Sequence, residues 1–151
     1  DATWGPEKRE LAGSMLAGLA FANATVGAVH AMAYPLGTQF HVSHGGSNAV
    51  MLVPVMRFNM PEATPLYARI ARAVLPNLAS GDDQAAAERL VHELDALIPE
   101  VGLENRLRAF GIEDTHLFDL TDGALRQQRI LSYNIKVPGR DDIEGMFRAV
   151  L

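Results

Sequence analysis

The stretch from Leu11 to Tyr34 constrains the fold of this chain most strongly, because it contains no Asp, Glu, Lys or Arg. It is long enough to span a bilayer. However, Ala, Gly, Ser, Asn and Thr make up much of it and His30 lies within it, so it would transfer poorly into hydrocarbon. Small side chains instead allow helices to approach closely. We therefore expect a buried helical segment at the centre of the fold and no membrane association.

Helix signals extend over most of the chain. Pro6 suits the first turn of a helix. Pro35 predicts that this helix, or pair of helices, ends near Tyr34, because the residue before a proline disfavours the helical conformation. Residues 35–43 are then expected to form a loop that leads into a helix start at His44.

Apolar spacing predicts the remaining helices, with a kink expected at Pro54. They are expected at about 49–58, 64–75, 82–98, 104–110, 114–125 and 140–150. Only residues 129–137 are ambiguous between helix and strand. The expected fold class is therefore all-α, a helical bundle formed by residues 1–151 as a single domain.

The charge balance and the absence of cysteine exclude several classes of protein. The chain has 13 Lys and Arg residues and 18 Asp and Glu residues, which give a net charge of −5. No basic cluster occurs, which argues against a nucleic-acid partner. Without cysteine there is no disulfide framework, thiol catalysis, zinc finger or iron–sulfur cluster. A cysteine-free chain fits a reducing compartment, so we expect a cytoplasmic location, and any metal must be bound by His, Asp or Glu.

The histidines fall into two groups. His92 and His116 have charged or polar neighbours on amphipathic helices and are expected at the surface. His30, His41 and His44 lie in a stretch almost free of charge, where they form either a metal site or hydrogen-bonded parts of the core. A metal could be bound by His30 and His44, if the loop between them folds back, or by His41 and His44 at spacing i, i+3.

A dense series of motifs runs through Gly18–Ala24, Gly27–Gly37, Phe40–Gly45, Asn48–Leu52 and Pro54. This series resembles the signature region of the iron-containing (group III, metal-dependent) alcohol dehydrogenases. The rest of the chain resembles the C-terminal helical domain of that family more loosely, through Tyr67–Ala71, Gly111-Ile112 and Asn134. The resemblance implies the dehydroquinate synthase-like helical bundle of that domain.

The resemblance also implies a ligand set. In that family an Asp and three His residues bind a divalent metal, iron or zinc, and the third and fourth ligands fall on His30 and His44. The first two come from an Asp-x-x-x-His motif, which is absent from this sequence, as is the glycine-rich nucleotide-binding domain. We therefore interpret the chain as a C-terminal fragment of a longer two-domain enzyme. That enzyme would use NAD or NADP to oxidise alcohols or reduce carbonyls, whereas this chain alone is expected to be inactive.

Two further residues take implied roles, and no residue is assigned to cofactor binding. Tyr34 stands where the family often has a histidine linked to proton relay, and a phenol exchanges protons less readily near neutral pH than an imidazole does. Phe21 corresponds to an aromatic residue of the substrate channel, although plain core packing is an equal alternative. Ser43 replaces a common proline before the last ligand.

The expected partners follow from the same resemblance. They are a small alcohol or carbonyl substrate and the missing N-terminal nucleotide-binding domain. A face of small residues around Ala20, Ala24 and Ala31 would be left bare, so a homo-oligomer is also expected. The alternative hypothesis is a helical interaction or scaffold domain with structural histidines and no catalysis.

Overall fold

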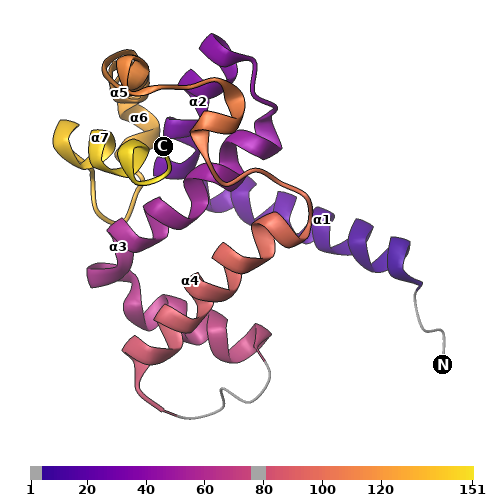
Figure 1. Cartoon of the computed structure of the whole chain (residues 1–151). Helices are drawn as coiled ribbons and strands as arrows, with labels where there is room; N and C mark the ends of the chain where they lie inside the picture. The colour runs from indigo at the N-terminus through magenta and orange to yellow at the C-terminus, as the bar shows by residue number, and fades with distance from the viewer. Residues whose placement is uncertain (1–4, 76–80) are drawn as a thin grey trace.

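The computed structural model describes residues 5–75 and 81–151, and every regular element in these ranges is a helix (Figure 1). The expected all-α fold class is confirmed. Residues 129–137, which were ambiguous, begin in a short helix and form no strand. In chain order the elements are α1 (Pro6–Ala24), α2 (Ala28–Phe40), α3 (His44–Val74), α4 (Asp83–Glu100), the 3₁₀ helices η1 (Leu107–Phe110) and η2 (Asp114–His116), α5 (Leu117–Leu125), α6 (Gln128–Leu131) and α7 (Arg140–Ala149).

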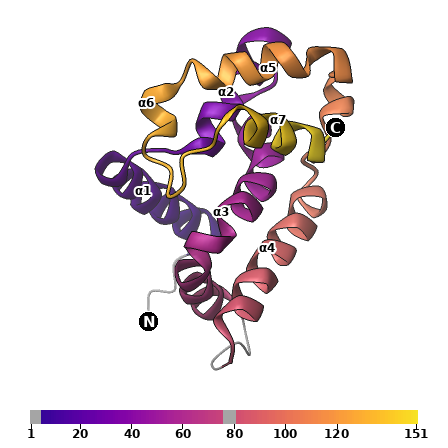
Figure 2. The ribbon, with the colours of Figure 1, turned by 90° about the vertical axis from the view of Figure 1, so that its left-hand side faces the viewer.

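Two apolar clusters hold these helices together. In the larger one, α2 packs against α3 and α5, and α7 packs against α5 and α3 (Figure 2). Its fully buried members include Met32 of α2, Leu120 of α5 and Phe147 of α7. The smaller cluster joins α3 to α4, where Ala68 packs in the same cluster as Leu90. Burying a large apolar side chain stabilises a fold by roughly 1.5–3 kcal/mol, so these clusters determine how the helices are arranged.

α2 continues through Pro35, so the expected helix end near Tyr34 and the expected loop over 35–43 are wrong. The helix ends at Phe40, and three residues, 41–43, connect it to α3. Pro35 is buried, and its Cβ lies only 2.7 Å from the position that a Cβ on Gly123 of α5 would take. Burial of the proline ring against α5 offsets the backbone hydrogen bond that proline cannot form.

α3 is a single helix where the sequence predicted two, over 49–58 and 64–75. Its two halves point in different directions (Figure 1). Each proline inside a helix removes one backbone hydrogen bond and favours a bend. Three prolines lie within α3: Pro54, Pro61 and Pro65. α3 ends at Val74 with Leu75 as its C-cap, within one residue of the expected end at 75.

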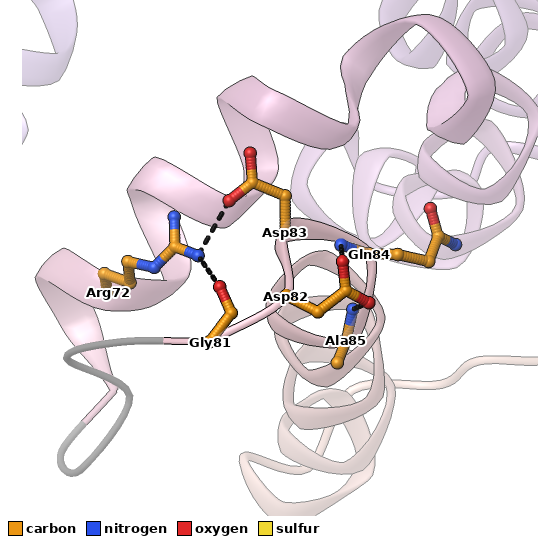
Figure 3. A network of polar contacts seen from close by, with 6 residues as sticks. All are labelled: Arg72, Gly81, Asp82, Asp83, Gln84 and Ala85. Carbon is orange, nitrogen blue, oxygen red and sulfur yellow. Dashed lines mark hydrogen bonds and ion pairs between the residues drawn. The ribbon is translucent and has the colours of Figure 1, made fainter.

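Polar contacts at the start of α4 connect it to α3 (Figure 3). Arg72 of α3 donates to the Asp83 carboxylate at 2.7 Å and to the Gly81 carbonyl at 2.8 Å. The carboxylate of Asp82 accepts hydrogen bonds from two backbone amides in the first turn of α4. This N-cap confirms the predicted start near Asp82 or Asp83.

The charge-free stretch divides into an exposed half and a buried half, so its expected central position is only partly correct. No residue of α1 is buried, and α1 projects from the rest of the molecule (Figures 1 and 2). α2, in contrast, lies in the core. The face of small residues that was expected to be uncovered is divided in the same way. Ala31 is fully buried by this chain, whereas Ala20 and Ala24 are exposed.

Within the described residues, no single helix is long and apolar enough to cross a membrane. α1 and α2 together reach the required length and composition, but their axes are bent by 105° at the break between them. The break includes Thr25, which has a positive φ of 61°. α2 also buries side chains against α3 and α5.

Thr121 provides a test of the packing around α2. Its side chain is fully buried, and its hydroxyl has no hydrogen-bond partner in residues 5–75 and 81–151. Because a buried hydroxyl without a partner loses its hydration, Thr121→Val should raise the free energy of unfolding by about 1 kcal/mol in urea denaturation. The exposed control, Thr115→Val, should change it by less than about 0.5 kcal/mol. A less stable Thr121→Val variant would contradict this account of the core.

Candidate functional site

α2 and α3 bring His30 and His44 together, as the family resemblance implied. His30 lies in the first turn of α2, and His44 is the first residue of α3. The Ser43 hydroxyl caps α3 by accepting a hydrogen bond from the Gly46 amide at 3.2 Å, which fixes the backbone at His44. The centroids of the two imidazole rings are 5.3 Å apart. Two imidazoles bound at tetrahedral angles to one ion, with nitrogens at about 2.1 Å, would have centroids about 5 Å apart.

The surroundings of His30 favour its neutral form. Burial lowers the pKa of His30, and the neighbouring His44 lowers it further because two imidazolium charges repel each other. A neutral imidazole carries a free nitrogen lone pair near pH 7, which is the form that binds a metal. His30 is therefore suited to donate to a cation.

All four residues expected at the site line one cavity of about 550 Å³, which lies between α1, α2, the start of α3 and Ile130. Tyr34 lines this cavity with its side chain 51% exposed. Phe21 lines it from α1 and is 60% exposed, so the alternative of plain core packing is wrong for this chain. The cavity thus combines paired imidazoles, a phenol and an aromatic wall.

The other histidines lie away from this cavity. His41 is the C-cap of α2, with a positive φ of 55°, and is exposed. It does not share a helix with His44, so the alternative pairing at i, i+3 is not formed. His92 is exposed on α4, as expected. His116 is not a simple surface residue, because its Nδ1 accepts from the Glu113 amide at 3.0 Å and its ring packs edge-on against Phe40.

Asn48 contacts His44 and had no role assigned from the sequence. Its Nδ2 donates to the His44 carbonyl at 2.8 Å and lies 3.3 Å from each nitrogen of the His44 ring. Equal distances to both nitrogens place the amide against the ring, where it restricts the rotation of the imidazole. The spacing i, i+4 along one helix was the available signal for this contact.

The donor set at the site is incomplete in this chain. Across residues 5–75 and 81–151 there is no group of three His, Asp or Glu side chains that could hold a metal ion. Two imidazoles suit iron or zinc, but such a site needs further ligands. His30 and His44 therefore fit half of a coordination shell.

The fold and the site define a helical domain in which two imidazoles meet at the wall of a cavity. The family model described as "Fe-containing alcohol dehydrogenase family, C-terminal" matches residues 7–151. The chain therefore belongs to the iron-containing alcohol dehydrogenases and corresponds to the C-terminal domain of that family.

Similar proteins agree with this assignment. Long-chain-alcohol dehydrogenase 1 of Geobacillus thermodenitrificans is 42% identical over 137 residues, which are 91% of this chain and 35% of that protein. The 1,3-propanediol dehydrogenase of Klebsiella pneumoniae is 33% identical over 135 residues, which are 89% of this chain and 35% of that protein. The crystal structure of a 1,3-propanediol oxidoreductase matches with a TM-score of 0.85 at 32% identity, over 91% of this chain and 36% of that one. This chain thus spans about a third of the length of these relatives.

The pKa of His30 can be measured from the chemical shifts of its ring protons. We expect a value below the ordinary 6.5, because burial and His44 both disfavour the proton. His44→Gln removes the charge but keeps polar bulk beside His30, so the pKa should rise while staying below 6.5. His41→Gln is the control and should leave it unchanged.

The pKa of His30 also determines how the free energy of unfolding depends on pH. The unfolded chain binds this proton more tightly, so the contribution of His30 to the free energy of unfolding is present above pH 6.5 and is lost as the pH falls. A His30 pKa at or above 6.5 in the unmodified chain would contradict the described burial.

Proposed function

We propose that this chain provides two ligands to the divalent metal of an NAD(P)-dependent alcohol dehydrogenase, which also reduces the corresponding carbonyls. The observation that supports this proposal most strongly is the 5.3 Å separation of the His30 and His44 rings at a cavity. The small number of donors agrees with it, because a domain that supplies half of a metal site needs only two. The remaining ligands would come from a part of the enzyme outside this chain.

His30 and His44 would hold the ion from one side. When bound, iron or zinc supplies a Lewis acid for the oxygen of the alcohol or carbonyl. Neutral imidazoles leave the positive charge of the ion uncompensated, which favours this chemistry. Asn48 would keep the His44 ring in a fixed orientation toward the cavity.

Tyr34 and Phe21 would act on the substrate side of the same cavity. Tyr34 follows His30 by one helical turn, so its phenol can exchange a proton with a group at the site and with solvent. Phe21 offers an apolar surface to the carbon chain of a small alcohol or aldehyde. Hydride exchange requires NAD or NADP, which would be bound by a nucleotide-binding domain outside this chain. The chain alone is therefore proposed to be inactive, and a cytoplasmic location remains part of the proposal.

Metal titration tests the ligand assignment. At pH 7.5, calorimetric titration of the 151-residue chain with Zn²⁺ should give weak binding of one equivalent, because two ligands come from the chain. His30→Ala and His44→Ala should each weaken binding by at least about tenfold. Removing a residue that only hydrogen-bonds to a metal ligand already costs about this much affinity, and removing the ligand itself should cost no less. His41→Ala is the control and should bind as the unmodified chain does. Equal binding by all four proteins would favour the scaffold alternative instead.

We further propose that α1 mediates self-association. Its exposed apolar side chains include Leu11, Met15 and Leu19, which follow one another at spacing i, i+4 and form a single stripe. Such a stripe on a helix without buried residues tends to find a partner. A second copy of the chain offers an identical stripe.

Light scattering during size-exclusion chromatography tests this association. We expect the unmodified chain to have a mass above 16.3 kDa that rises with concentration. Met15→Lys places a charge in the stripe and should shift the chain toward the monomer. Ala17→Lys, on the opposite face of the exposed helix, is the matched control and should behave like the unmodified chain. A strict monomer at high concentration would contradict the proposal.

A further inference from the structure

We infer that Asn134 is a positioning residue, which holds the first turn of α2 against α3 and thereby sets the separation of His30 and His44. Its importance for metal binding rests on the proposed function, whereas the positioning itself does not. Asn134 lies in the turn after α6, 106 residues from Ala28 in the sequence. The contact therefore joins two distant parts of the chain at the helix that carries His30.

The Asn134 side chain uses all of its polar groups. Its Oδ1 accepts from the Ala28 amide at 3.2 Å and from Asn59 Nδ2 at 3.4 Å. Its Nδ2 donates to Asn59 Oδ1 at 2.7 Å and to the Lys136 carbonyl at 2.8 Å. Reversing the amide would point an N–H group at the Ala28 N–H, so these partners determine its orientation.

This contact compensates for a missing helix cap. The N-cap of α2 is Gly27, which has no side chain to accept from the first amides of the helix. Asn134 supplies the acceptor from another part of the chain instead. Because Ala28 and His30 share the first turn of α2, fixing one restricts the other.

Gly27 makes the close approach possible. A Cβ at this position would lie 2.9 Å from Asn134 Oδ1 and 3.6 Å from Asn134 Cα. The φ of Gly27 is −120°, which other residues also adopt, so a substitution would act through this contact and not through backbone strain. Gly27→Ala should therefore push Asn134 away from the first turn of α2, and it disrupts the same contact as a substitution of Asn134.

Asn59 completes the connection on the α3 side. It is 6% exposed and lies on the same helix as His44. Together with Ala28, His30 and Asn134 it lines a second cavity of about 630 Å³. The first turn of α2 thus meets α3 in two ways, through His30 and His44 and through Asn134 and Asn59. Loss of the second contact should loosen the first.

The positioning can be measured without metal. In the unmodified chain, NMR should detect a nuclear Overhauser effect between the ring protons of His30 and His44, whose centroids are 5.3 Å apart. Asn134→Leu and Gly27→Ala should each abolish or strongly weaken this effect. Gly145→Ala is the control, because a Cβ there meets nothing within 4 Å, and it should keep the effect. Thermal unfolding shows which variants are folded, and a purely structural role would lower the melting temperature without changing the effect in the folded chain.

Zn²⁺ titration of the same samples separates the inference from the proposed function. In the unmodified chain and in Gly145→Ala, both histidines should shift along one binding curve. In Asn134→Leu and Gly27→Ala the affinity should fall by about tenfold or more. If the unmodified chain binds no zinc, the proposed function fails. The positioning role of Asn134 is then tested only by the nuclear Overhauser effect between the His30 and His44 ring protons. If that effect is absent from the unmodified chain or persists in either folded variant, the inference is overturned.

Discussion

The burial of α2 is the constraint on which the rest of this domain depends. Met32 and Leu36 are fully buried in the larger cluster, and small residues such as Ala28 and Ala31 let the neighbouring helices approach. Gly123 shows how close this approach is, because a Cβ there would be 2.7 Å from Pro35. A larger residue at such a position would force α5 away from α2 and disturb both helices.

This burial also determines what α2 can do for function. A helix that buries one face must expose another, and His30 and Tyr34 lie one turn apart on the side that faces the cavity. His30 is partly buried there, which lowers its pKa and keeps its nitrogen available, whereas Tyr34 remains half-exposed. The same packing therefore produces a partly buried imidazole and a phenol in contact with solvent within one helical turn.

The sequence predicted the helices well where capping and apolar spacing agree, as at Asp82 and in α7. It failed where tertiary packing overrides a local rule. Pro35 signals a helix end, but its ring is buried against α5 and the helix continues. The sequence also placed α1 in the core, because a charge-free helix looks the same whether or not this chain supplies a partner for it.

The site shows the same division between local and distant information. The sequence allowed His30, His44, Tyr34 and Phe21 to be predicted, because the residues around them resemble a known family. These four residues do line one cavity. The contact of Asn48 with His44 could in principle have been predicted, since the two residues lie one helical turn apart. Asn134 was named only as part of the family resemblance, and its contact with Ala28 could not be predicted, because a polar residue 106 positions away gives no periodic or local sign of its partner. A helix that starts at a glycine, with no cap of its own, still needs an acceptor for its first amides. Its N-terminus is therefore where a distant polar side chain should be sought when a ligand-bearing helix must be held in place.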